Sequence, residues 1–297
     1  MRRSRYLRNP NALPHRLTYR DIEILKSIDR FKYLSSQQIA DLFSLTRQAI
    51  NKRLRLLFHH HYLGKLSGQL SPNLFNSPDI YFIDLDLKAT RRLAAKHVSL
   101  PHQKRVNRKN PKRDYIAHTL LTNDCLNAFE LATSKQKELV LFSSDKLLME
   151  NPVQKQNISH TWKVTAFMSE QNISRTAYPD AAFALFDKRS NKTQLYLVEA
   201  DRMTQPLTRR DKQLFRTSNI KAKLLIYHTA WKQGVFRERL GYPATRIIFV
   251  TLSAERAEHM RALATKLFGK KAPGLFVFTD INSLSPEAFN LAEFIKP

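Results

Sequence analysis

The amino-acid sequence predicts an α/β protein, α+β overall, with a small helical domain followed by a larger mixed sheet flanked by helices. Two observations predict this class. Residues 17–58 carry three amphipathic helical patterns with capping signals. From residue 139 onward, near-continuous apolar segments alternate with helical patterns, which is typical of a mixed or parallel sheet covered on both faces. The chain has 297 residues, of which 42% are hydrophobic, so it can bury a sizeable core.

Charge is distributed unevenly along the chain. Residues 1–113 hold 24 of the 50 Lys and Arg but only seven of the 25 Asp and Glu. An excess of this kind favours a polyanion, and double-stranded DNA is the partner that we expect. The boundary is predicted in the basic segment 101–113, which has too few apolar residues to pack. This gives a basic arm over 1–16, a DNA-binding domain over 17–100, a basic linker, and an α/β domain over 114–297.

Composition argues against several other classes. No run of about 18 apolar residues and no cleavable signal is visible, so we expect a cytoplasmic protein with no membrane partner. The single cysteine, Cys125, excludes an internal disulfide and a cysteine-rich zinc site. The histidines at 59–61 have no cysteine or acidic cluster beside them, and we expect them to be helix-end residues.

The first domain is predicted to begin with two helices and to end with two strands. The first helix follows Thr18, a residue type that caps helices, and extends to Phe31. The second begins at Ser35, which can form a capping box with Gln38. After a third helix, the segments YLGKLSGQL and DIYFIDL are predicted as two strands separated by a turn.

The third helix, in SLTRQAINKRLRLLF, carries the predicted DNA contacts. Ile50, Leu54 and Leu57 recur at i, i+4 and i+7 and define its buried face. The opposite face presents side chains that can read base edges and hold phosphates. These side chains are Arg47, Gln48, Asn51, Lys52 and Arg55. A solvated face would show the same pattern, but the closely spaced helices, the two strands and the charge favour a winged helix-turn-helix.

The second domain is predicted to start with a long helix over DYIAHTLLTNDCLNAFELATSK. A strand over ELVLF follows, then a strand or loop edge over WKVTAFM. Residues 178–202, YPDAAFALFDKRSNKTQLYLVEADR, contain two strands joined by a polar turn. A helix is expected from about Pro206. The apolar segments KAKLLIYH, RIIFVTL and GLFVFTD are expected as strands, with a helix over AERAEHMRALATKLF.

Acidic residues at the ends of the hairpin 178–202 form the candidate catalytic site. Asp180 opens its first strand, and Glu199 and Asp201 close its second, so the three carboxylates should converge. Carboxylate oxygens suit Mg²⁺, which makes these three residues candidate metal ligands and Mg²⁺ the candidate cofactor. Nucleases with Pro-Asp and Glu-x-Lys carry a lysine where this chain has Asp201, and Lys212 is the candidate replacement. An ordinary structural hairpin is the alternative.

Six segments in order along residues 17–252 resemble the replication-relaxation family of plasmid and mobile-element proteins. They are LTYRDIEIL, YLSSQQIADLF, RLRLLF, HTLLTND, YPDAAF and VEADR. The resemblance implies an N-terminal winged helix and a domain similar to the PD-(D/E)xK nucleases. It also implies a bacterial protein at the nucleoid or a plasmid, acting in replication, DNA relaxation or their control. In an active protein of that fold, Asp180 and Glu199 would hold Mg²⁺ and a lysine would support the nucleophile.

Three functions stay open from the sequence. The first is a DNA-binding protein of a mobile element whose nuclease-like domain is degenerate, because the lysine is missing from its place. The second is a metal-dependent endonuclease or nickase targeted by the winged helix, so enzymatic activity is undecided. The third is a transcriptional regulator. Other replication, transposition or conjugation proteins, and a second copy of the chain, remain open as partners beside DNA.

Overall fold

The computed structural model describes residues 6–12, 14–66, 78–102, 111–150, 162–208, 214–215, 219–269 and 274–295. The chain divides into two compact units, Met1–Asn123 and Asp124–Pro297. The division lies inside helix α5 (Arg113–Ser134), later in the chain than the predicted linker. The start of α5 belongs to the first unit because Gln38 donates a hydrogen bond to the Leu120 carbonyl at 2.8 Å.

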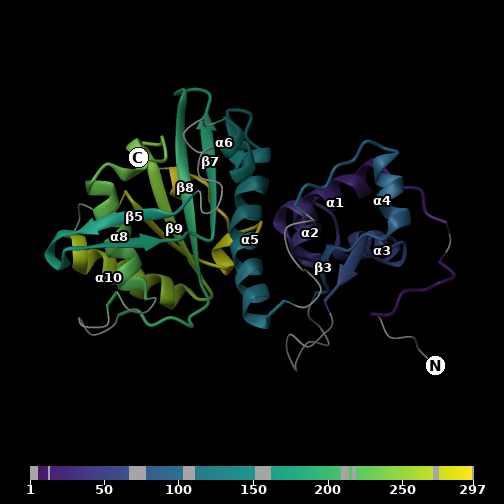
Figure 1. The fold of residues 1–297 in the computed structure, drawn as a ribbon, viewed down its shortest axis with the longest axis horizontal. Coiled ribbons are helices and arrows are strands. Elements are labelled where there is room, and N and C mark those ends of the chain that lie inside the picture. The colour runs from purple at the N-terminus through teal and green to yellow at the C-terminus, as the bar shows by residue number, and fades with distance from the viewer. Residues whose placement is uncertain are drawn as a thin grey trace. The chain divides into compact units, whose positions relative to one another are not determined.

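The first unit runs helix, strand, two helices, two strands and a further helix along the chain (Figure 1). Its elements are α1 (Tyr19–Phe31), β1 (Leu34–Ser35), α2 (Ser36–Leu42), α3 (Arg47–His59), β2 (Leu63–Lys65), β3 (Ile80–Ile83) and α4 (Leu87–Ala94). β3 pairs in antiparallel fashion with both β1 and β2, and α3 packs against α2 and β2. The sequence predicted these helices except α4, whereas most of the loop between β2 and β3 lies outside the described residues.

Local capping explains where α1 and α2 begin. Thr18 accepts a hydrogen bond from the Asp21 backbone while the Asp21 side chain accepts one from the Thr18 backbone, which forms a capping box. Ser35 and Gln38 form the same arrangement at α2, as predicted. Each box satisfies backbone N–H groups that have no partner within the helix, so it defines the helix start.

The second unit is built on a mixed sheet. Its helices and strands are α5, β4 (Leu139–Ser143), α6 (Ser144–Glu150), β5 (Val164–Met168), β6 (Ile173–Ala177), β7 (Ala181–Asp187), β8 (Lys192–Asp201), α8 (Ile220–Lys232), α9 (Val235–Glu238), β9 (Thr245–Thr251), α10 (Ala254–Phe268), β10 (Phe276–Asp280) and α11 (Ala292–Ile295). In the described residues the strand order is β10-β9-β8-β7-β4, with β8, β9 and β10 parallel and β4 and β7 antiparallel. The predicted α/β class and the mixed sheet flanked by helices are therefore confirmed.

Helices cover both faces of this sheet (Figure 1). On one face, Leu197 and Phe249 lie in a core cluster with Leu224 of α8 and Met260 of α10. On the other face, Phe129 of α5 packs against aromatic side chains of β7 and β8. The two-stranded β5–β6 sheet contacts α8. Since side chains alternate along a strand, odd-numbered residues of β8 point to the α8 and α10 face.

One predicted strand is wrong. KAKLLIYH, residues 221–228, lies within helix α8. Asn219 caps this helix by accepting a hydrogen bond from the Ala222 backbone at 2.8 Å, and Leu224 and Tyr227 are fully buried. The helix expected from about Pro206 is not found over 206–208, and residues 209–213 lie outside the described part of the chain.

Candidate functional site

The carboxylate site lies where β7 begins and β8 ends. Asp180 precedes β7, and its backbone N–H donates to the Val198 carbonyl at 2.8 Å. Its side chain accepts a hydrogen bond from the Ala200 N–H, also at 2.8 Å. Asp180 is therefore bonded to β8 on either side of Glu199. The antiparallel hairpin brings these two acidic residues together, although they are far apart in the sequence.

Glu199 is the most deeply buried carboxylate of the site. Its side chain points to the α8 face of the sheet and only 1% of the residue is exposed. Lys223 Nζ lies 2.6 Å from Glu199 Oε2, and the Tyr227 hydroxyl donates to Oε1 at 2.5 Å. Lys223 and Tyr227 are four residues apart, so they occupy the same face of α8. Each Glu199 oxygen thus has its own donor from one helix.

Burial and charge set the protonation of this group. Burial raises the pKa of Glu199 above its ordinary value, and Asp180 adds to this effect while the Lys223 ammonium opposes it. Burial alone would lower the pKa of Lys223, but the charges of Glu199, Asp180 and Asp201 outweigh it and the pKa rises. Burial and the Glu199 charge raise the pKa of Tyr227 well above its ordinary value. Lys223 and Tyr227 therefore keep their protons at neutral pH.

Asp201 is bound by a different helix. Its Oδ2 accepts a hydrogen bond from Arg256 Nε of α10 at 2.8 Å, and Arg256 also donates to the Gln205 carbonyl at 2.5 Å. The second oxygen, Oδ1, is buried and has no hydrogen-bond partner among the described residues, and the same holds for Thr251 Oγ1 on the neighbouring strand. Asp201 and Thr251 are register partners of β8 and β9. Arg256 therefore fixes the segment that leaves β8.

These contacts do not favour a shared metal ion. Within the described part of the chain, no group of three His, Cys, Asp or Glu side chains is arranged to hold one. Both Glu199 oxygens accept hydrogen bonds from α8, and one Asp201 oxygen pairs with Arg256. The Mg²⁺ site predicted for Asp180, Glu199 and Asp201 stays a prediction, and the residues in this arrangement do not fit the ion.

The cation beside Glu199 is Lys223, which the sequence reasoning missed. The predicted replacement, Lys212, lies outside the described residues. The available signal was a Lys followed four residues later by a Tyr within 221–228. That spacing places two side chains together only on a helix, and this segment had been predicted as a strand.

The predicted DNA-binding face of α3 is exposed. Ile50, Leu54 and Leu57 are fully buried, as the helical spacing predicts. On the other side Asn51 is half-buried, and Arg47, Gln48, Lys52 and Arg55 are exposed. The structure gives these five side chains no hydrogen bond or ion pair with another described residue. They are consequently available to a ligand of opposite charge.

Contacts with neighbouring elements hold α3 in place. Arg53 on its flank bonds the buried Asp21 carboxylate of α1 at 2.8 Å. Arg8, from the basic arm, pairs with Asp84 at 2.8 Å and donates to the carbonyl of Phe58 near the end of α3. His59 accepts a hydrogen bond from the backbone of the arm. Arg8 therefore has a structural partner, while residues 1–5 of the arm lie outside the described residues.

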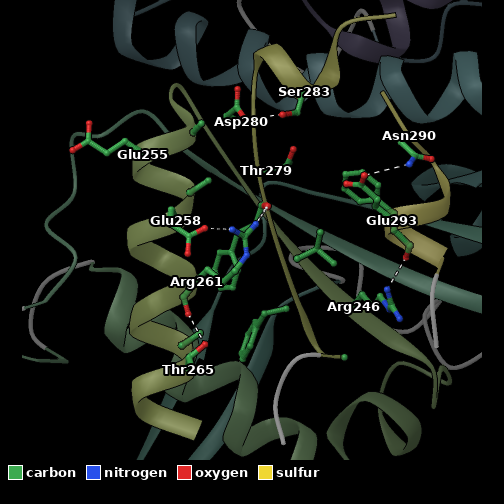
Figure 2. A pocket seen from close by; sticks show the side chains of 18 of the residues that line it. Arg246, Glu255, Glu258, Arg261, Thr265, Thr279, Asp280, Ser283, Asn290 and Glu293 are labelled. Atoms are coloured by element: carbon green, nitrogen blue, oxygen red, sulfur yellow. Dashed lines mark hydrogen bonds and ion pairs between the residues drawn. The ribbon is translucent and has the colours of Figure 1, made fainter. Parts of the chain in front are cut away.

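A cavity of about 940 Å³ lies in another part of the second unit, along β10, α10 and the C-terminal residues (Figure 2). Two arginines in it already have partners of the same unit. Arg261 donates to the Phe278 carbonyl and pairs with Glu258, and Arg246 donates to the Phe294 carbonyl. The described residues lining the cavity include none of the predicted site residues.

Comparison with protein families gives a match for most of the chain. A family model described as replication-relaxation matches residues 25–239. The chain belongs to the replication-relaxation family. The matched range includes α3 and the group formed by Asp180, Glu199 and Lys223. Family membership supports a replication-related protein of a mobile element. Neither the curated proteins nor the solved structures gave a match. Among the described helices none is long and apolar enough to cross a membrane.

Proposed function

We propose that this replication-relaxation protein binds double-stranded DNA of a mobile element through α3 and acts in replication, relaxation or their control. The observation that carries the proposal is the exposed polar face of α3 opposite a fully buried one. The order α1-β1-α2-α3-β2-β3 is that of a winged helix-turn-helix, in which the third helix enters the major groove. The excess of basic residues in the first 113 residues supports the same partner.

The second unit is proposed to be nuclease-like in arrangement but not to cleave DNA. Its hairpin relates Asp180 to Glu199, and helix α8 adds Lys223; an acidic pair with a lysine is also the residue set of the PD-(D/E)xK nucleases. Lys223 and Tyr227 hold Glu199, and Arg256 holds Asp201. These hydrogen bonds and ion pairs attach helices α8 and α10 to the sheet, so the carboxylates act first as structural groups. The unit then serves as a platform for other proteins of the element.

The DNA-binding proposal is tested with the full chain and a fluorescent random-sequence duplex. Arg47→Ala/Lys52→Ala should weaken binding several-fold or more, because two cations facing phosphates are lost. The matched control is Arg20→Ala/Lys26→Ala, which removes two exposed cations of α1. Circular dichroism checks that both variants stay folded. Equal affinity of the α3 variant and the control would refute the assignment of this face.

Metal-dependent cleavage is the second candidate function, and one observation favours it. Lys223 Nζ lies 2.6 Å from Glu199 Oε2, so a lysine reaches the acidic residue although Asp201 occupies its usual sequence position. For cleavage, Glu199 would have to exchange these bonds for other ligands. Our proposal expects no conversion of supercoiled plasmid to nicked or linear DNA with Mg²⁺ or Mn²⁺. Robust conversion that is lost in Glu199→Ala would establish the second candidate instead.

A further inference from the structure

Helix α4 is an addition to the first unit that the sequence patterns did not predict. It begins directly after β3 with Asp86 as its cap, whose side chain accepts a hydrogen bond from the Ala89 N–H. Ala89 and Leu93 are buried at 1% and 3% exposure and attach the helix to the unit. These two residues are one turn apart, so the helix has a single narrow packed face, and its other residues are exposed except for the half-buried Arg92.

Helix α4 and the turn that follows it carry a group of cations, which we call the α4 basic stripe. It consists of Lys88, Arg91, Arg92 and Lys96. The first three are spaced at i, i+3 and i+4 and are therefore neighbours on the helix. No acidic residue occurs between Asp86 and Asp114 in the sequence. The structure gives none of the four a hydrogen bond or ion pair between side chains of the described residues. Arg92 is half-buried and the other three are exposed.

Helix stability does not account for the stripe. Arg91 and Arg92 lie in the last turn, where cations interact favourably with the helix dipole. Lys88, however, lies in the first turn, where the dipole disfavours a positive charge. Like charges at i, i+3 and i+4 also repel one another. The helix itself therefore gains little stability from this group of neighbouring cations.

The stripe belongs to the same compact unit as α3. The Asp86 N–H donates to the His61 carbonyl at 3.4 Å, and the Asp84 N–H donates to the Tyr62 carbonyl at 3.2 Å. Both acceptors come just after the end of α3, so the start of α4 is bonded to the segment that leaves it. The start of α4 is thus attached to the end of α3 within one unit.

We propose that the α4 basic stripe is a second DNA contact, which binds the phosphate backbone of the duplex held at α3. The inference rests on the proposed DNA-binding function and adds a surface to it. Lysine and arginine neutralise phosphates without reading bases, so this contact adds affinity but no sequence preference. In this arrangement the α3 face reads base edges, while the stripe adds sequence-independent affinity.

The test compares the salt dependence of DNA binding in the full chain. The variant is Lys88→Ala/Arg91→Ala, and the charge-matched control is Arg20→Ala/Lys26→Ala on α1. All four positions are exposed helix positions at which alanine is well tolerated. Log affinity falls with log salt with a slope of about 0.9 per phosphate contact, so the variant should show a slope shallower by roughly 1.8. It should weaken binding to unrelated duplexes to the same extent, and the control should keep the wild-type slope.

The outcomes separate this inference from the proposed function. If wild type binds duplex DNA and the α4 variant keeps the slope of the control, the stripe makes no phosphate contact and the inference fails alone. If the control loses slope equally, general charge explains the effect and the inference fails as well. If the wild-type chain binds no duplex at all, the proposed function fails, and the inference fails with it.

Discussion

Replacing Lys223 with methionine should destabilise the second unit in a pH-dependent way. Methionine keeps a similar length but removes the cation that lies 2.6 Å from Glu199. Glu199 is 1% exposed, and the Lys223 side chain is 19% exposed. A buried carboxylate without its counter-charge is costly, so Glu199 in the variant must either stay charged in a poor environment or take up a proton.

The size of this effect has a ceiling that rises with pH. Breaking a buried ion pair by removing one partner costs about 3–5 kcal/mol. The part of the loss that depends on the charge of Glu199 cannot exceed the free energy of protonating it, which is about 1.4 kcal/mol per pH unit above its ordinary pKa of 4.5. That ceiling is roughly 0.7 kcal/mol at pH 5 and roughly 3.4 kcal/mol at pH 7.

The direction follows from the raised pKa of Glu199. A carboxyl whose pKa is higher in the folded state stabilises the fold fully below its unfolded pKa and loses that contribution as pH rises through the folded pKa. The Lys223 charge opposes the rise in the pKa of Glu199. Removing it raises that pKa further, so the variant loses more stability than the wild type as pH increases. We expect the destabilisation by Lys223→Met to grow by about 1–3 kcal/mol between pH 5 and pH 7.

Urea unfolding followed by tryptophan fluorescence measures this loss in the relevant unit. Both tryptophans, Trp162 and Trp231, belong to the second unit. The matched control is Lys266→Met, which removes an exposed lysine of α10 and should show a small loss independent of pH. Adding Glu199→Gln to Lys223→Met should restore part of the stability at pH 7. An equal loss at pH 5 and pH 7 in Lys223→Met would refute the view that Lys223 neutralises a charged Glu199.

Three further predictions concern other residues. Tyr227→Phe removes a donor to Glu199 and should lower the free energy of unfolding by about 1–3 kcal/mol in the same urea assay, whereas an unchanged midpoint would mean that this hydrogen bond is not made. Gly64→Ala places a methyl group against the Phe82 ring and should cost about 1–3 kcal/mol through overpacking, measured by thermal unfolding; an unaltered melting temperature would contradict the packing of β2. Limited trypsin digestion should cut first within residues 101–113, because this segment carries basic residues and few apolar ones, and first cleavage within β9 would count against it.

Features of the fold that depend on neighbouring residues were predictable from the sequence. The capping boxes at Thr18 and Ser35 involve only positions three apart, and the hairpin of β7 and β8 has a polar turn between apolar runs. Helix α8 was not predictable in this way. It packs between the sheet and the β5–β6 pair, so it is apolar on more than one side, and Leu224 to Tyr227 form a continuous run like that of a buried strand.

Of the candidate site, only the residues of the β7–β8 hairpin could be placed from the sequence. Asp180 and Glu199 could be placed side by side because antiparallel pairing relates them directly. Lys223 and Arg256 come from two helices packed on the sheet, and the side chain that each helix aims at the carboxylates depends on tertiary packing. The exposed face of α3 was predictable because burial of Ile50, Leu54 and Leu57 fixes its opposite side. Helix α4 was missed because it is short and only two of its residues are buried.

The two units differ in whether their cations are paired with acidic residues of the chain. In the second unit, α8 supplies a cation and a hydroxyl to Glu199, and α10 supplies an arginine to Asp201. Positive charge at the end of β8 is thus engaged with the chain's own carboxylates. In the first unit, the cations on the exposed face of α3 (Arg47, Lys52 and Arg55) and those of the α4 basic stripe have no acidic partner among the described residues. They lie in the part of the chain with the larger excess of charge. A polyanion gains more from unpaired cations, because no internal ion pair has to break on binding. This difference supports the proposal that DNA binds to the first unit, whereas the carboxylates of the second unit hold its own helices in place.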